Sequence, residues 1–226
     1  ILAIYFGLQY WFSKEKKHVE NRLFARFCFA SALWSLGFGI LLSQNNADIA
    51  HFGRIIGMIG TFLYLIFAQM LVGQIADCSS AWRKFSNGVA YIGVGIYFFT
   101  VQREQIDYYP SVWGMTYSFK AGIGNTLYTL YCVSVAVDIL VTIIYMIRGS
   151  KLKRVQAFGK KMLWVLALIV YGMILDTIFP LVGLKAIPGS TITQFFGVIV
   201  IHYAISELSR SRINITNMSE FIYSSL

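Results

Sequence analysis

Apolar runs long enough to cross a lipid bilayer constrain this chain more than any other feature of its sequence. A spanning helix needs roughly 20 apolar residues, because each residue rises about 1.5 Å through a hydrocarbon core about 30 Å thick. We expect seven helices, at 1–12, 23–42, 52–75, 87–101, 121–147, 162–182 and 191–205. Hydrophobic residues make up 57% of the chain and charged residues only 13%, unlike a soluble domain. The sequence therefore predicts an all-α, polytopic membrane protein built as a seven-transmembrane-helix bundle.

Two of the seven segments fit this pattern imperfectly. The segment 1–12 is too short to span and begins without a charged flank, so we expect further residues upstream of Ile1. The segment 87–101 is short and rich in glycine, and a re-entrant segment is the alternative there.

Basic residues between the apolar runs predict the orientation. If all seven segments cross, 15 of the 19 lysines and arginines fall on one side, and the other side keeps only Arg54, Arg103, Lys120 and Lys185. Cytoplasmic loops carry such an excess of basic residues. We therefore expect the N-terminus outside and the C-terminus in the cytoplasm. This topology also accounts for the net charge of +9, so we expect the lipid bilayer and not nucleic acid as the partner.

Polar side chains inside the fifth segment are the first candidate functional residues. Spacings of three or four residues place a set of them on one helix face, which we expect to look into the bundle. The set is Tyr131, Ser134, Asp138, Thr142 and Tyr145. A carboxylate such as Asp138 within a membrane needs a partner, because burying it alone is unfavourable by several kcal/mol.

The last segment carries a second polar stripe, made by Gln194 and His202, which are eight residues apart. Asp138 and His202 have similar expected depths, so we predict a hydrogen bond between them. A buried pair of this kind titrates near neutral pH, which would make it a proton sensor.

Charged residues near the outer side form another predicted pair. Arg54 has the reach to contact Asp176 from the outer end of the third segment. Asp176 also lies four residues before Pro180, which cannot donate to its carbonyl, so we expect a kink there. These polar groups have three open interpretations, namely structural contacts between helices, a ligand or proton-sensing pocket, and a transport path.

Glycines in the third segment point to helix packing. Gly53, Gly57 and Gly60 lie on one face, where small residues let another helix approach closely. We expect this packing to be internal to the chain.

Heptad spacing predicts that the last helix continues past the bundle. Positions Ile201, Leu208, Ile215 and Ile222 repeat every seven residues. We therefore divide the chain into a sensor domain, 1–205, and a cytoplasmic signalling helix, 206–226, that pairs with a second copy and leads to an effector module. An amphipathic helix lying on the membrane is the alternative for 206–226.

The aromatic connection "QREQIDYYPSVWGMTYSFK" should pack on the outer mouth of the bundle.

The remaining motifs exclude several functions. We predict no catalytic residue, metal site or cofactor, because the chain has no "HExxH", no "CxxC" and no glycine-rich phosphate loop. A retinal photoreceptor would need a lysine within 191–205, and none is present.

Together these letters and this layout resemble the seven-helix N-terminal membrane region found ahead of bacterial histidine kinases, and in some proteins ahead of diguanylate cyclase modules. The resemblance rests on "FASALWSLGFGILL", on "FGRIIGMIGTFLYLIFAQMLVGQ" and on the aromatic outer connection. It implies a multi-pass sensor in the bacterial cytoplasmic (inner) membrane. Its stimulus would be a small molecule, lipid or peptide, and its exit helix would lead to a PAS, kinase or cyclase module. A secondary transporter or channel that uses the intramembrane acids is the alternative function.

Overall fold

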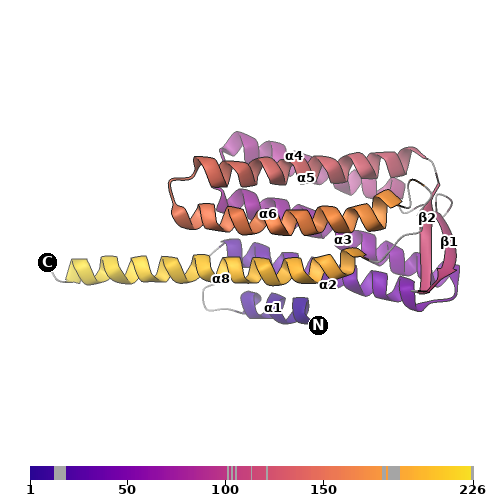
Figure 1. The fold of residues 1–226 in the computed structure, drawn as a ribbon, viewed down its shortest axis with the longest axis horizontal. Coiled ribbons are helices and arrows are strands. Elements are labelled where there is room, and N and C mark those ends of the chain that lie inside the picture. Colours follow the sequence, from indigo (N-terminus) through magenta and orange to yellow (C-terminus); the bar gives the residue numbers. More distant parts are fainter. Residues whose placement is uncertain are drawn as a thin grey trace.

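The computed structural model describes residues 1–12, 19–100, 102, 104, 106–112, 114–120, 122–179, 182 and 189–224. Within these ranges, the side chains of residues 80, 98, 99, 119, 176, 177, 191 and 209–224 lie outside the description. The helices are α1 (Leu2–Trp11), α2 (Val19–Ser43), α3 (Ala47–Ile75), α4 (Ser80–Thr100), α5 (Ile123–Gly149), α6 (Lys153–Met173) and α8 (Gly189–Ser224), with a π-helical turn, η2 (Ile174–Ile178), after α6. They form one elongated bundle, from which α8 projects at one end (Figure 1).

Each of the seven predicted helices is present and in the predicted order. Among the described residues, α2, α3, α5 and α6 are long and apolar enough to cross a membrane, and α8 contains a shorter apolar stretch, Ile192–Leu208. The helix α1 has only 10 residues, and α4, although 21 residues long, does not reach the same apolarity. The chain is therefore a helical membrane protein, as its composition predicted.

The aromatic connection between the fourth and fifth predicted helices departs from the all-α prediction, because it folds as a β-hairpin. Strand β1 (Ile106–Ser111) pairs antiparallel with β2 (Gly114–Phe119), and Ser111 lies opposite Gly114. Tyrosine and threonine are frequent in strands, and the glycine supplies the left-handed backbone of the turn, with φ of 103°. The hairpin covers the end of the bundle opposite to the C-terminus of α8, as predicted for its packing though not for its structure (Figure 1).

The glycines of α3 bring α2 into direct backbone contact. A Cβ atom added to Gly60 would lie 2.2 Å from the Trp34 nitrogen, and one added to Gly37 would lie 2.0 Å from the Gly57 nitrogen. A Cβ on Gly53 would lie 2.7 Å from the Leu41 nitrogen. The predicted close, internal approach of a helix to this face is confirmed, and the neighbour is α2.

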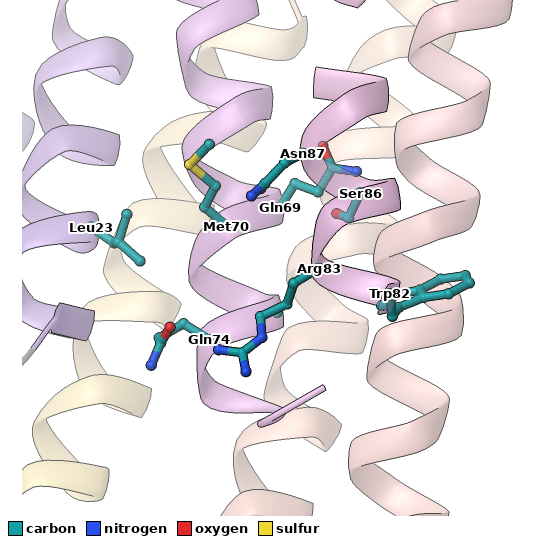
Figure 2. A pocket seen from close by; sticks show the side chains of 9 residues that line it. Leu23, Gln69, Met70, Gln74, Trp82, Arg83, Ser86 and Asn87 are labelled. Carbon is teal, nitrogen blue, oxygen red and sulfur yellow. The ribbon is translucent and has the colours of Figure 1, made fainter. Parts of the chain in front are cut away.

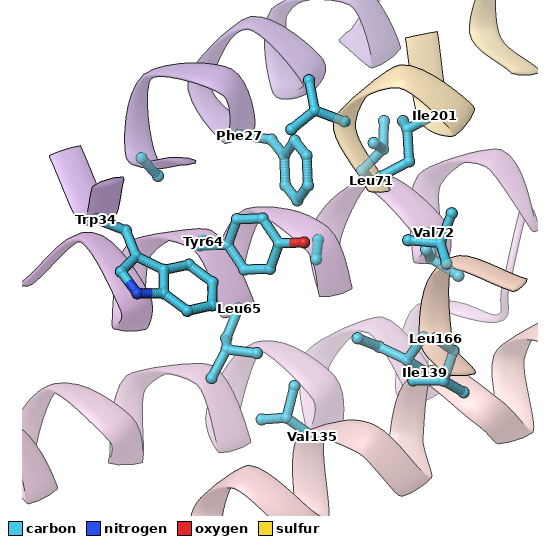
Figure 3. Close-up of a cluster of buried hydrophobic side chains, with 14 of the residues drawn as sticks. Phe27, Trp34, Tyr64, Leu65, Leu71, Val72, Val135, Ile139, Leu166 and Ile201 are labelled. Carbon is cyan, nitrogen blue, oxygen red and sulfur yellow. The ribbon is translucent and has the colours of Figure 1, made fainter. Parts of the chain in front are cut away.

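The core lies between α2, α3, α5, α6 and α8. Figure 3 shows Phe27 and Trp34 of α2 facing Tyr64 of α3, with Val135 of α5 and Ile201 of α8 on other sides of the cluster. Tyr64 is fully buried, and its ring centroid lies 4.4 Å from that of Phe27. Because residues from five helices share this core, their relative positions are coupled.

The distortion predicted before Pro180 is present as the π-helical turn η2. The Phe179 backbone N–H donates to the Ile174 carbonyl, one residue further back than in an α-helix. Pro180 itself lies outside the described residues. The missing proline N–H explains why the ladder of α6 does not continue regularly through this point.

Candidate intramembrane polar site

Asp138 lies in the interior of the bundle, 11 residues before the end of α5, and is only 6% exposed. Its Oδ2 atom accepts two hydrogen bonds from two other helices. The Gln69 Nε2 of α3 donates over 2.5 Å, and the Ser86 Oγ of α4 donates over 2.9 Å. Asp138 therefore ties α3 and α4 to α5 at one point.

Two further side chains extend this contact toward the α8 end of the bundle. The Thr142 hydroxyl, one turn after Asp138, donates to the Asp138 carbonyl over 2.9 Å. It accepts a hydrogen bond of 3.3 Å from the Trp82 indole of α4. We name Gln69, Trp82, Ser86, Asp138 and Thr142 the Asp138 cluster. Its members come from three helices, so the cluster links α4 to both α3 and α5.

A cleft of about 180 Å³ opens beside this cluster between α3 and α4. Figure 2 shows Gln69 and Ser86 at its inner wall and the exposed Arg83 lying across it toward Gln74. The cleft is lined by Leu23, Gln69, Met70, Gly73, Gln74, Trp82, Arg83, Ser86 and Asn87. A second groove, of about 280 Å³, lies on the other side of Trp82 and includes Cys78 and Thr142. The Asp138 cluster thus stands between two hollows.

The predicted Asp138–His202 hydrogen bond is wrong. His202 stacks on Phe6 of α1, with ring centroids 4.0 Å apart, and meets Tyr10 edge to face. Its Nδ1 is buried and has no hydrogen-bond partner within the described part of the chain. The reason is the arrangement of the helices, because α8 packs against α6, α2 and α1, whereas α5 packs against α3, α4 and α6.

The predicted inward face of α5 is only partly correct. Tyr131, Asp138 and Thr142 are buried, but Ser134 is exposed and Tyr145 is 51% exposed. The face that enters the core is centred on Val135, Ile139 and Ile143, so residues on one side of the polar stripe fall at the surface. Tyr131 packs against α4, where a Cβ on Gly93 would lie 2.5 Å from its hydroxyl.

Gln194 makes a second polar contact, far from the Asp138 cluster. Its Nε2 donates to the Ser31 Oγ over 2.6 Å and to the Ser31 carbonyl over 3.1 Å, while its Oε1 accepts from the Ser35 Oγ over 3.3 Å. Gln194 and His202 do share one side of α8, but that side faces α1 and α2. This contact holds α8 to α2.

Arg54 is fully buried beneath the hairpin. Its Nη1 donates to the Thr100 carbonyl at the end of α4 over 2.8 Å, and its guanidinium lies 5.6 Å from the centroid of the Tyr117 ring of β2. The Asp176 side chain lies outside the described residues, so the Arg54–Asp176 pair stays a prediction. Arg54 joins α3, α4 and the hairpin.

The heptad positions of α8 divide into two groups. Ile201 and Leu208 are 1% and 5% exposed and belong to the core of this same chain, so they are occupied by internal packing and not by a second copy. Ile215 and Ile222 lie on helical backbone, and their side chains are outside the described part. The heptad pattern predicted the continuation of the helix but misassigned the partner of its first half, because an apolar helix face packs equally well within its own chain.

Polar contacts hold α8 where it leaves the bundle. The Tyr10 hydroxyl of α1 lies 3.0 Å from the Ser206 Oγ, and the Lys161 ammonium of α6 forms a salt bridge with Glu207. We name Tyr10, Lys161, Ser206 and Glu207 the base contacts of α8. The two members in α8, Ser206 and Glu207, are the first two residues of the predicted signalling helix, 206–226.

Three members of the Asp138 cluster were missed from the sequence, namely Gln69, Trp82 and Ser86. Gln69 had a usable signal, because it is an amide in the middle of the apolar run 52–75. Ser86 and Trp82 had none, because they lie before the predicted start of the fourth helix at residue 87. That helix begins earlier, at Ser80.

Cys78 lies in the turn between α3 and α4, beside the cluster. Burial raises the pKa of its thiol, and the negative charge of Asp138 raises it further, while Arg83 acts in the opposite direction. The described residues contain no group of three or more histidine, cysteine, aspartate or glutamate side chains that could hold a metal ion. The cluster is built from one acid and neutral polar groups.

Comparisons with known proteins give no relative for this arrangement. The chain matches no protein-family model, no curated protein and no solved structure.

Proposed function

We propose that this chain is the transmembrane input domain of a bacterial signalling protein, of the two-component histidine kinase or cyclic-di-GMP type. A stimulus in the membrane or at the outer face shifts the packing of the helices. The helix α8 then carries the shift to an output module in the cytoplasm.

The continuity of α8 is the observation that carries this proposal. One unbroken helix runs from Gly189, beside the hairpin end, through the core at Ile201 and out to Ser224 (Figure 1). A rigid helix transmits rotation or displacement along its length. A helix that only closed a bundle would have no need to project from it.

The distribution of charge supports the proposed orientation. The connection between α5 and α6 lies at the end from which α8 projects (Figure 1). It carries Lys151, and the adjoining helix ends carry Arg148, Lys153 and Arg154. Basic connections of this kind remain in the cytoplasm. In the proposal all seven helices cross, the N-terminus and hairpin are outside, and α8 ends in the cytoplasm of a bacterial inner-membrane protein.

The proposed homodimer uses the projecting part of α8. Because Ile201 and Leu208 are buried in their own bundle, the contact between copies falls after Leu208, where Ile215 and Ile222 continue the spacing. Two heptads are short for an independent coiled coil, so pairing would depend on the modules that follow.

Insertions after Ser211 test the relay. In the full-length protein, adding one, two, three and four residues rotates everything downstream by about 100° per residue. We expect the output activity to vary periodically with the number of residues added, with four residues restoring most of the original phase. An output that ignores these insertions would contradict the relay through α8.

A transporter or channel is the second candidate, favoured by one observation, the buried Asp138 beside an open cleft. Ion flux in proteoliposomes that is lost in the Asp138→Asn variant would support it. Flux that is absent from the wild-type protein would leave the signalling proposal as the better account.

A further inference from the structure

Two buried oxygen atoms of the Asp138 cluster have no hydrogen-bond partner within the described residues. They are the Asp138 Oδ1 and the Gln69 Oε1, on side chains that are 6% and 3% exposed. Both donors to the carboxylate fall on the other oxygen, Oδ2. Buried polar atoms are nearly always paired, so two unpaired atoms in adjacent side chains indicate an occupant.

Both of these atoms are hydrogen-bond acceptors, which defines the chemistry of that occupant. A carboxylate oxygen and an amide carbonyl oxygen are satisfied by a donor or by a cation. A negatively charged or purely apolar ligand would leave both oxygens unsatisfied. The site therefore takes a hydrogen-bond donor or a cation.

Within the part of the chain that the structure describes, no positively charged side chain hydrogen-bonds to these two oxygens. Toward Asp138, α3 presents Gln69, and α4 presents Ser86 and Trp82, which are all neutral. The residues that α6 buries at this level are apolar, namely Met162, Val165 and Leu166. The nearby titratable group is the Cys78 thiol in the α3–α4 turn. Arg83 lines the cleft but is exposed and lies toward Gln74, and the salt bridges described for this chain are Lys120–Asp107 and Lys161–Glu207 (Figure 2).

We propose that the Asp138 cluster is a binding site for a monovalent alkali cation, held by Asp138 Oδ1 and Gln69 Oε1 and reached through the cleft between α3 and α4. One carboxylate balances one positive charge. Carboxylate, amide carbonyl and hydroxyl oxygens are the ligands that hard cations prefer, whereas divalent sites usually gather more acidic groups.

The cleft supplies the route to the site and room for water ligands. Its volume of about 180 Å³ is large enough for several water molecules, each of which occupies about 30 Å³ in the liquid. A partly hydrated ion in the cleft reaches the side chains of Gln69 and Ser86, and Asp138 lies directly behind them, hydrogen-bonded to both. The bound ion would join α3 and α5 directly and would fix α4 through Ser86.

The positive charge of Arg83 opposes cation binding at this site. Its guanidinium lines the same cleft, so its positive charge repels an entering cation. Replacing it with a neutral residue of similar length should strengthen cation binding, whereas a site unrelated to the cleft would not respond.

Thermal unfolding of the purified chain in lipid nanodiscs tests the site, with Na⁺ as the probe. Sodium chloride is titrated at constant ionic strength and constant pH, with choline chloride as the replacement salt. We expect the Tm to rise with Na⁺ and to saturate, because a ligand that binds only the folded state stabilises it. Asp138→Asn should abolish the rise, and Arg83→Gln should shift it to lower Na⁺ concentration.

Asp77→Asn is the matched control. Asp77 is exposed in the α3–α4 turn and has φ of 49°, which asparagine tolerates, so the rise in Tm should persist. Gln69→Met keeps the volume but removes the oxygen, and it should weaken Na⁺ binding about tenfold or more. This variant also serves if Asp138→Asn does not fold.

Three outcomes would overturn the proposal. One is a Tm that does not depend on Na⁺ in the wild-type chain. Another is a dependence on Na⁺ that both Asp138→Asn and Gln69→Met retain. The third is stabilisation by acid with no effect of Na⁺, which would make a proton the occupant.

The cation site rests on the proposed function only where the ion is taken as a stimulus. Na⁺ binding is measured on the isolated chain, without any output. If binding is present but insertions after Ser211 leave the output unchanged, the site stands and the relay fails. If Na⁺ does not bind but the insertions after Ser211 change the output, the relay stands and the cation site fails.

Discussion

Two interfaces on opposite sides of α3 are built in contrasting ways. Toward α2, the helices meet through glycines, and backbone touches backbone at Gly37, Gly57 and Gly60. Toward α4 and α5, part of the contact is made by hydrogen-bonded polar side chains around Asp138, with a cleft beside them. The first interface has no room to adjust, and the second contains space and hydrogen bonds that can be exchanged.

This difference separates a rigid part from a part that can respond. A packed backbone interface resists displacement, because atoms already in contact cannot move closer. Near Asp138, the interface of α4 is made by hydrogen bonds to one carboxylate and by Trp82, which lies between two cavities. We infer that α2 and α3 form the frame of the bundle and that α4 is the helix that shifts when the Asp138 cluster changes.

The largest effect is expected from filling the glycine interface. Gly60→Leu places a side chain where the Trp34 backbone nitrogen is 2.2 Å from the added Cβ, so α2 must move away. We expect a loss of about 3 kcal/mol of stability, or failure to accumulate as folded protein. The measurement is monodispersity on size-exclusion chromatography together with thermal unfolding.

Gly39→Ala is the control for this substitution. Gly39 also lies in α2, but an added Cβ meets no atom within 4 Å. Its stability should stay equal or rise by about 0.5 kcal/mol, since alanine favours a helix over glycine. If Gly39→Ala lost as much stability as Gly60→Leu, the α2–α3 interface would not be the tightly packed one that we infer.

A smaller effect is expected on the polar side. Ser86→Ala deletes one hydrogen bond to the Asp138 carboxylate, and we expect a loss of about 1 kcal/mol. Ser134→Ala on the exposed side of α5 should have no measurable effect, because its hydroxyl bonds only within its own helix. Chemical denaturation of the reconstituted protein compares them. A loss in Ser134→Ala as large as in Ser86→Ala would argue against the Asp138 cluster.

The smallest effect concerns the Cys78 thiol, which reports on the cluster without disturbing it. Its pKa is raised above the ordinary value by burial and then by the charge of Asp138, so little thiolate is present at neutral pH. In a background where Cys28 and Cys132 are replaced by alanine, alkylation by iodoacetamide should be slow. The alkylation rate should increase as the pH rises. At constant pH it should be modestly higher in Asp138→Asn, because this variant removes a neighbouring negative charge. An unchanged rate in that variant would place the carboxylate farther from the thiol than the structure does.

The sequence predicted the parts of this molecule that depend on local pattern. The seven helices follow from hydropathy and length, and the close approach of another helix to α3 follows from Gly53, Gly57 and Gly60. The continuation of α8 past the bundle follows from its heptad spacing. Each of these properties is encoded within one segment.

The parts that were missed depend on which segments become neighbours. Residue spacing places Asp138 on an inward face but does not say which helix lies opposite that face. The sequence therefore predicted His202 as the hydrogen-bond partner of Asp138, whereas the partners are Gln69 and Ser86. The same limit explains Ser134 and Tyr145, because the rotation of α5 is decided by its packing against α3, α4 and α6. The hairpin was missed because its strands are only six residues each, within a connection.

The base contacts of α8 make the projecting segment a lever. Residues 209–224 extend about 24 Å beyond Leu208 at 1.5 Å per residue, so a tilt of about 5° around Ser206 and Glu207 displaces the far end by roughly 2 Å. A displacement that is too small to disturb the packed core is in this way amplified at the tip of the helix. Two tilting tips that belong to neighbouring copies would double the change in their separation.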